Sequence, residues 1–218
     1  MIDEKKILIE NLLKNGYIQS EKVKKAMETV EREEFIPKNM KKYAYLDRPL
    51  PLSKGQTISA PHMVAFICEK LEIKDGMNIL EIGTGFGYNA AVISEVMNKK
   101  GHVYSIERIE SLAKTAINNL KRNGYEKSVD VIIGDGTLGY EKGGPYDRIY
   151  GTAGNPYVPE SLKKQLKVGG RLLIPIGDKS DFQDLICIFK ESENKFIEKS
   201  LGEVVFVPMI GKYGWSEK

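Results

Sequence analysis

The chain has 218 residues, of which 41% are hydrophobic and 29% are charged, the balance of a globular protein with one sizeable core. Its net charge of +3, its lack of any apolar run near the roughly 20 residues that span a bilayer, and its charged amino terminus argue against nucleic-acid binding, membrane insertion and a signal peptide. Two distant cysteines and two histidines, none at ligand spacing, predict a cytoplasmic protein without a metal site, and we expect a monomer.

Helical periodicity covers residues 1–35 and predicts two helices. Gly16 ends the first helix, and Ser20 has the position of an N-cap for the second. The segment 35–59 contains three prolines and is expected to be loop-rich, whereas 61–71 is predicted as a helix with a proline in its first turn. The apolar stripes expected on the first two helices are Ile7, Leu8, Leu12 and Leu13, then Val23, Met27 and Val30.

Strand and helix patterns alternate from Gly76 onward, with glycine-rich turn signals between them. This alternation predicts an α/β fold with a doubly wound, mostly parallel sheet. Only a polar turn at 177–180 separates the predicted strands 170–175 and 184–190, so we expect an antiparallel pair near the carboxyl end. The predicted strands are 77–82, 102–106, 129–133, 146–151, 170–175, 184–190 and 203–207, and the predicted helices are 88–98, 110–122 and 159–167.

A glycine loop, Glu81-Ile-Gly-Thr-Gly-Phe-Gly87, joins the strand 77–82 to the helix 88–98. A strand, a glycine loop and a helix in this order mark a nucleotide-type cofactor site at the carboxyl end of a parallel strand. Twenty residues after Gly87, at the end of the next predicted strand, Glu107 can accept both ribose hydroxyls of an adenosine. Because of this spaced acid, a tight turn without a ligand is the weaker interpretation.

The spacing of the glycines favours one class of cofactor. Dinucleotide sites use G-x-G-x-x-G and P-loops use G-K-[ST], whereas this loop has G-x-G-x-G and no Lys or Arg in or just after it. An acid, Glu81, opens the loop instead. An acid suits a ligand that carries an ammonium and a sulfonium, and S-adenosylmethionine (AdoMet) is such a ligand.

Two further polar segments are candidates for chemistry. Gly134-Asp135-Gly136 follows the third strand of the sheet core, where an aspartate can accept the exocyclic amine of adenine; a simple turn is the alternative. Gly55-Gln-Thr-Ile-Ser-Ala-Pro-His62 supplies the hydroxyls of Thr57 and Ser59 and a histidine in the first turn of the next helix. Whether Ser59 only caps that helix stays open, because capping and a role in the chemistry are compatible.

A serine-hydrolase triad is not expected. The sequence contains no G-x-S-x-G, and neither histidine has an obvious acidic partner.

Along most of its length the chain resembles the protein-L-isoaspartate (D-aspartate) O-methyltransferase family. The block Gln56–His62 is highly specific to that family, whereas the glycine loop alone indicates only an AdoMet-dependent methyltransferase. The matching stretches are 32–37, 44–51, 55–65, 80–91, 103–107, 134–136, 145–147, 165–171 and 206–208.

The resemblance implies one Rossmann-like methyltransferase domain over 1–218, with a helical extension and substrate loop at 1–75 and an AdoMet-binding sheet core at 76–218. It implies methyl transfer from AdoMet to the free α-carboxylate of L-isoaspartyl, and also D-aspartyl, residues of damaged proteins or peptides. The products are S-adenosylhomocysteine and a methyl ester, which collapses without the enzyme to a succinimide and hydrolyses partly to aspartate. No metal is implied.

Carried onto this chain, the resemblance makes Ser59 the active-site residue. The substrate-binding residues implied are Thr57, Ile58, Ser59, Val207 and Pro208. The cofactor-binding residues implied are His62, Glu81, Gly83, Thr84, Gly85, Gly87, Glu107, Arg108, Asp135, Gly136 and Thr152. Ile210 and Gly214 depart from polar residues of some relatives, so the role of the tail 209–218 stays open.

The expected chemistry needs no strong base, because a carboxylate with a pKa of about 3 to 4 is already an anion at neutral pH. Ser59 is expected to orient it by a hydrogen bond, and alignment is expected to supply the catalysis. Two other functions stay open, since the fold does not decide function. One is an AdoMet enzyme acting on RNA or a small molecule; the other is a protein that binds AdoMet or damaged chains without turnover.

Overall fold

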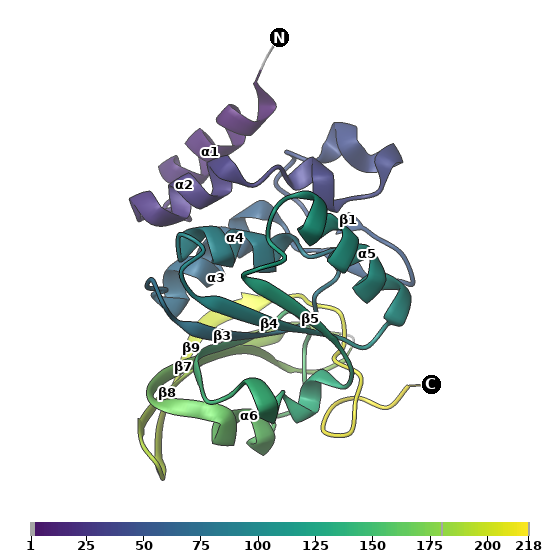
Figure 1. Ribbon diagram of the computed structural model, residues 1–218. Coiled ribbons are helices and arrows are strands. Elements are labelled where there is room, and N and C mark those ends of the chain that lie inside the picture. The colour runs from purple at the N-terminus through teal and green to yellow at the C-terminus, as the bar shows by residue number, and fades with distance from the viewer. Residues whose placement is uncertain (1–2, 180, 218) are drawn as a thin grey trace.

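A sheet whose described part has seven strands forms the middle of the molecule in the computed structural model, which describes residues 3–179 and 181–217 (Figure 1). The order across the sheet is β5-β4-β3-β6-β7-β8-β9. Strands β3 to β7 run parallel, while β8 is antiparallel to both of its neighbours. Their bounds are β3 Asn78–Ile82, β4 His102–Glu107, β5 Val129–Ile133, β6 Tyr146–Gly151, β7 Leu166–Gly177, β8 Gln183–Ser192 and β9 Lys195–Val204. The predicted α/β fold and the antiparallel strands at the carboxyl end are confirmed.

Helices cover both faces of this sheet, and each face has its own apolar core. Side chains alternate between the faces along a strand: Ile79 of β3 belongs to the core that includes residues of α1 to α4, and the next residue, Leu80, belongs to the core that includes α6. The helices are α1 Glu4–Lys14, α2 Glu21–Thr29, α3 Pro61–Leu71, α4 Tyr88–Val96, α5 Glu110–Arg122 and α6 Glu160–Gln165. Short 3₁₀ turns lie at Arg32–Phe35, Lys38–Tyr43, Gly136–Leu138 and Glu141–Gly143.

The helix α3 begins as predicted at Pro61, but Ser59 is not its cap. The N-cap position belongs to Ala60, which has no side chain to accept a hydrogen bond. The interpretation of Ser59 as only a cap is therefore wrong. Ser20, by contrast, caps α2 as predicted, because its Oγ accepts a hydrogen bond from the amide of Val23 at 3.3 Å.

A small antiparallel ladder joins the loop-rich segment to α3. Its strands are β1 Leu50–Pro51 and β2 Thr57–Ile58, and Leu50 pairs with Ile58. This ladder, followed directly by α3, fixes the direction in which residues 57–62 approach the carboxyl ends of the large sheet.

Three sequence predictions need correction. The buried stripe of α1 is Leu8, Ile9 and Leu12, while Ile7 and Leu13 are exposed. Residues 166 and 167, predicted to end a helix, open β7 by pairing with β6. The strand predicted at 203–207 is β9 at Lys195–Val204. That edge strand is polar and mostly exposed, so it lacks the apolar pattern of a buried strand, and the apolar run after it leaves the sheet. Ser180, in the predicted polar turn, lies outside the described residues.

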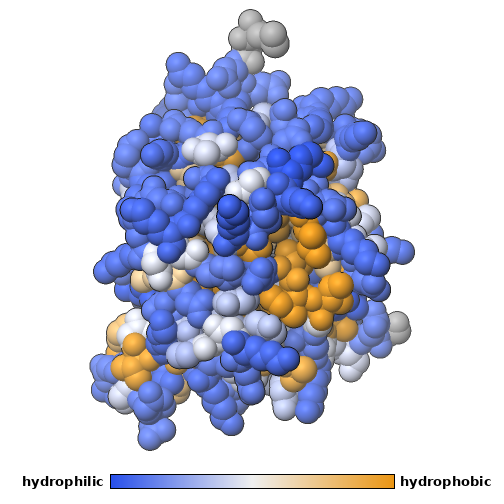
Figure 2. Space-filling model, in the orientation of Figure 1, coloured by the Kyte–Doolittle hydropathy of each residue, from blue (hydrophilic) through white to orange (hydrophobic). Residues whose placement is uncertain are grey.

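The surface is mainly hydrophilic on the face drawn in Figure 2, and its broadest apolar area lies over the region of β5 and α5. Exposed apolar side chains on these elements include Ile133 at the end of β5 and Ile117 on α5. Within residues 3–179 and 181–217, none of the helices combines the length and the apolar character needed to cross a membrane.

Candidate functional site

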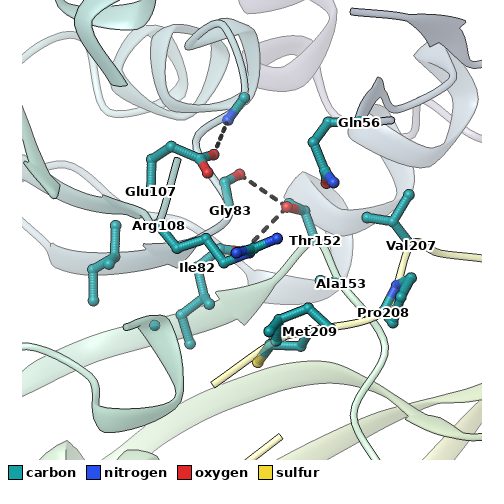
Figure 3. A pocket seen from close by; sticks show the side chains of 14 residues that line it. Gln56, Ile82, Gly83, Glu107, Arg108, Thr152, Ala153, Val207, Pro208 and Met209 are labelled. Atoms are coloured by element: carbon teal, nitrogen blue, oxygen red, sulfur yellow. Dashed lines mark hydrogen bonds between the residues drawn. The ribbon is translucent and has the colours of Figure 1, made fainter. Parts of the chain in front are cut away.

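A cavity opens at the carboxyl ends of β3, β4 and β6 (Figure 3). Glu107 and Arg108 form one side of it, while Gln56 and Val207 lie on the opposite side. We call it the nucleoside cavity. Its lining residues are Gln56, Ile82, Gly83, Gly85, Ile106, Glu107, Arg108, Gly136, Thr152, Ala153, Val207, Pro208, Met209 and Ile210.

The glycine loop brings its backbone against this cavity. Gly83 has φ +97°, and a Cβ there would lie 2.2 Å from Oγ1 of Thr152. Thr152, directly after β6, donates that hydroxyl to the carbonyls of Ile82 at 3.1 Å and Gly83 at 2.9 Å. Only glycine can occupy position 83 without displacing Thr152. The end of β6 therefore holds the loop of β3 in place.

Glu107 is the carboxylate of the nucleoside cavity. Its Oε2 accepts a hydrogen bond from the amide of Gly85 at 3.0 Å, and its Oε1 accepts one from the amide of Ile109 at 2.9 Å. Burial raises its pKa above the ordinary value, while the hydrogen bonds from Ile109 and Gly85 lower it. Each oxygen keeps a further lone pair, so this fixed carboxylate suits a pair of hydroxyl donors.

A second cavity, which we call the acceptor cavity, lies on the other side of Thr152. Thr57, Ser59 and His62 line it, together with residues at the end of β9 and just after it. The full lining is Pro49, Thr57, Ser59, Ala60, His62, Met63, Thr152, Phe182, Glu203, Val204, Val205 and Phe206. It contains hydroxyls and an imidazole beside exposed apolar side chains, which fits a peptide better than a compact polar metabolite.

His62 has an acidic partner that the sequence analysis missed. Oδ1 of Asp47 accepts a hydrogen bond from the backbone amide of His62 at 2.9 Å and lies 2.8 Å from its Nδ1. Asp47 thereby satisfies an amide in the first turn of α3 and orients the imidazole in one contact. The other histidine, His102, pairs with Asp130 at 3.1 Å, away from these cavities. The hydrogen bonds of the described residues include none between Ser59 and His62, so a serine-hydrolase triad is not formed.

A narrow slot shares lining residues with both cavities. Thr152 lines the nucleoside cavity, the acceptor cavity and the slot. Gly83 and Gly85 belong to the slot and the nucleoside cavity, and Ser59 belongs to the slot and the acceptor cavity. The slot is lined by Leu52, Ile58, Ser59, Gly83, Thr84, Gly85, Phe86, Tyr88, Asn89 and Thr152. Thr152 and Ser59 thus border spaces that adjoin one another at the end of the glycine loop.

The structure brings most of the predicted residues to these spaces, with some exchanges. His62 lies in the acceptor cavity although it was predicted to bind the cofactor, and Val207 and Pro208 line the nucleoside cavity although they were predicted to bind substrate. Gly87 and Asp135 line none of the three. Asp135 instead accepts hydrogen bonds from Thr137 and, at 2.7 Å, from the amide of Lys212 in the tail.

Glu81 is also absent from the lining of these three spaces. It projects from β3 to the same sheet face as Ile79, where it is fully buried and accepts a hydrogen bond from Oγ of Ser105. Ser105 in turn contacts Oγ1 of Thr84 in the loop at 2.6 Å. Burial raises the pKa of Glu81 to about 8. Glu81 thus supports the glycine loop from behind.

The nucleoside cavity fits the adenosine part of AdoMet. Its lining combines the fixed carboxylate of Glu107, the backbone of Gly83 and Gly85, and the apolar side chains of Ile82, Ile106 and Ile210, a set that suits ribose hydroxyls and a base. Among the described residues, no cluster of His, Cys, Asp and Glu could hold a metal ion.

Comparison with known proteins agrees with this geometry. The family model of protein-L-isoaspartate(D-aspartate) O-methyltransferase matches residues 3–214. The chain belongs to this family. The protein-L-isoaspartate O-methyltransferase of Methanothermobacter thermautotrophicus is 50% identical over 215 residues, covering 99% of both chains. That of Thermococcus sibiricus is 51% identical over 211 residues, covering 96% of this chain and 95% of the relative.

Solved structures of the family have the same fold. The crystal structure of the Plasmodium falciparum PCMT protein in complex with S-adenosyl-L-homocysteine matches with a TM-score of 0.85 and 30% identity, over 96% of this chain and 99% of that chain. A second structure, of a protein-L-isoaspartate O-methyltransferase, has a TM-score of 0.86 and 34% identity, covering 96% of this chain and 67% of that one. The Rossmann-like methyltransferase fold expected from the family resemblance is confirmed.

Several residues of this family member's site were missed from the sequence. Gln56 lies inside the segment 55–62 and could have been found by extending the site one residue toward the amino terminus. Asp47 lies in a matched stretch, but nothing in its spacing indicates His62 as a partner. Phe182 and 203–205 carry no motif, and they reach the acceptor cavity from the turn before β8 and from the end of β9.

Proposed function

We propose that this protein transfers the methyl group of AdoMet to the free α-carboxylate of L-isoaspartyl and D-aspartyl residues in damaged proteins. The observation that carries the proposal is the position of Thr152, which lines both cavities and the slot. A donor in one cavity and a carboxylate in the other would then meet beside Thr152. The resulting ester collapses to a succinimide without the enzyme, which begins repair.

The residue roles divide between the two cavities. Glu107 accepts hydrogen bonds from the ribose hydroxyls, and the backbone of Gly83 and Gly85 contacts AdoMet where it lies beside Thr152. Ser59 orients the substrate carboxylate, with His62 beside it. Further cofactor contacts are proposed for Thr84, Arg108, Gly136, Val207 and Pro208, and further substrate contacts for Thr57 and Ile58. Glu81, Gly87 and Asp135 act by shaping the backbone around the donor.

The chemistry asks for alignment more than for proton transfer. AdoMet, when bound, supplies a methyl group activated by a sulfonium. A substrate carboxylate is already ionised at neutral pH, so the chain needs no general base. Ser59 holds the anion by a hydrogen bond, and the walls of the slot exclude water from it. Several kcal/mol of barrier lowering is available from such positioning, on the order of what intramolecular reactions show.

We also propose that the protein works in the cytoplasm as a monomer on protein and peptide substrates, without nucleic acid or membrane. The unpaired cysteines Cys68 and Cys187 support a reducing compartment. Residues 1–75 act as the helical extension and substrate loop, and 76–218 as the cofactor-binding core of one domain.

Methyl transfer from labelled AdoMet to matched peptides tests this proposal. A peptide with one isoaspartyl residue should be methylated far faster than the same peptide with L-aspartate. The extra backbone methylene redirects the chain and leaves a free α-carboxylate at the donor. Equal rates on the two peptides, label found in RNA alone, or AdoMet binding without turnover would each reject it.

A further inference from the structure

The amide of Asn89 is an unused polar group beside the glycine loop. Asn89 is the second residue of α4, lines the slot, and is 9% exposed. Its Oδ1 is buried and has no hydrogen-bond partner among the described residues. An acceptor buried without a partner is costly to the fold, so its retention calls for an explanation.

A neighbouring asparagine shows what a structural role looks like here. Asn119 on α5 is also buried, and its Nδ2 donates to the carbonyl of Phe86 at 3.1 Å while its Oδ1 accepts from Arg122 at 3.2 Å. Its amide is satisfied within the protein and holds the loop. The amide of Asn89 holds nothing comparable, although both side chains lie next to the same loop.

The position of Asn89 indicates which part of AdoMet lies beside its side chain. With the ribose at Glu107 and the methyl group directed past Thr152 toward Ser59, the amino-acid end of AdoMet is left on the slot side of Gly83 and Gly85. That end carries an ammonium, whose donors need acceptors when they leave water.

Two side chains could accept from this ammonium, and the structure separates them. Glu81 is fully buried behind the loop and does not line the slot; its Oε2 accepts from Ser105, while its Oε1, like Oδ1 of Asn89, has no partner among the described residues. With its pKa raised to about 8 by burial, it is largely uncharged at neutral pH. Asn89 lines the slot itself and has a free acceptor atom.

We infer that Oδ1 of Asn89 accepts a hydrogen bond from the α-ammonium of AdoMet in the slot. The inference rests on the proposed function and deepens it, because it assigns a recognition residue for the amino-acid end of the donor. Glu81 then supports the loop through Ser105 and Thr84, and Asn89 makes the contact that the sequence analysis gave to Glu81.

Calorimetry with three adenosine thioethers tests the assignment. S-adenosylhomocysteine carries the ammonium and the carboxylate, its decarboxylated 3-aminopropyl analogue carries the ammonium alone, and methylthioadenosine carries neither. Asn89→Leu, which keeps the volume and removes the acceptor, should weaken the first two by about 10- to 100-fold and leave methylthioadenosine unchanged. Asn89→Asp, which keeps an acceptor, should retain most of the affinity. Asn118→Leu, on an exposed position of α5, is the matched control and should change none of them.

Four outcomes would overturn the inference. They are equal losses for all three ligands, a loss confined to S-adenosylhomocysteine (which would assign the amide to the carboxylate), no loss at all, and a larger loss for Glu81→Gln than for Asn89→Leu. If Asn89→Leu does not fold in a thermal scan, Asn89→Ala takes its place with the same expected pattern. Failure of the unmodified protein to bind S-adenosylhomocysteine would instead reject the proposed function.

Discussion

The carboxylate of Glu107 and the backbone amide of Gly85 are joined by a hydrogen bond of 3.0 Å. Glu107 ends β4, and Gly85 lies in the loop after β3, so one contact ties together the carboxyl ends of two adjacent parallel strands. The carboxylate that we propose as the ribose acceptor therefore also fixes the glycine loop. Binding of the nucleoside and the shape of the loop depend on the same side chain.

Replacing Glu107 by Ala should weaken AdoMet binding by about 1–3 kcal/mol, because a buried charge-assisted acceptor is lost. The AdoMet affinity of Glu107→Gln should lie between those of the unmodified protein and Glu107→Ala, since an amide oxygen still accepts one hydrogen bond. Isothermal calorimetry gives both values. Glu126→Ala, at an exposed position beyond α5, serves as the control. Unchanged affinity in Glu107→Ala would reject the ribose assignment, and NADH binding tighter than AdoMet would reject the class of cofactor.

Ser59→Ala should lower kcat by about 10- to 1000-fold while AdoMet affinity stays near normal, as expected when one hydrogen bond to the transition state is lost. The N-cap of α3 is Ala60, so the melting temperature should change little. Ser53→Ala, an exposed serine of the same loop-rich segment, is the matched control. Normal turnover in Ser59→Ala would remove Ser59 from the reaction, and a methylated Ser59 in mass spectra would contradict direct transfer to the carboxylate.

Local sequence patterns predicted those parts of the site that depend on one strand and the turn after it. The glycine loop and Glu107 each follow a buried strand, and parallel strands end at a common edge of the sheet. The order of strands and helices along the chain is therefore enough to predict that the loop and Glu107 lie close together. The contact between Asp47 and His62 spans an irregular segment, whose course depends on packing against the sheet. No periodicity predicts such a course.

Glu81 shows a second limit. The sequence places an acid at the start of the loop, but the pleat of β3 decides which face its side chain takes, and it takes the face under α4. Similarly, β9 is a polar edge strand that pairs with β8 through backbone hydrogen bonds, and its side chains carry little apolar signal. Tertiary pairing, not intrinsic pattern, forms this strand.

Asp47→Ala should remove the acceptor for both the backbone and the ring of His62. We expect a loss of stability of about 1 kcal/mol, comparable to a lost N-cap, and a several-fold fall in kcat/KM for the isoaspartyl peptide with AdoMet affinity retained. Asp130→Ala breaks the other Asp–His pair, away from the cavities, and is the control for the general effect of such a loss. Equal kinetic effects of the two variants would show that the pair at His62 has no part in the acceptor cavity.

Glu81 should make the stability of the protein depend on pH in a defined direction. Burial raises its pKa in the folded protein to about 8, from the ordinary value of 4.5. Between these values the folded state holds a proton that the unfolded state has released. The contribution of Glu81 to the free energy of unfolding is therefore complete below about pH 4.5. It is lost as the pH rises through about 8, at up to about 1.4 kcal/mol per pH unit.

Glu81→Gln removes this ionisation while keeping the volume of the side chain and an acceptor for Ser105. Urea unfolding between pH 5 and pH 9 should give a falling free energy of unfolding for the unmodified protein and a flatter profile for the variant, so that the variant gains relative stability toward alkaline pH. Asp75→Asn is the control, because hydrogen bonds from Lys22, Asn98 and Lys100 lower the pKa of Asp75 to about 2 and confine its effect to acid pH. Parallel profiles for Glu81→Gln and the unmodified protein would show that Glu81 is ionised in the folded state across this range. The ammonium of AdoMet would then have a charged partner behind the loop, and the division of roles between Glu81 and Asn89 would be reversed.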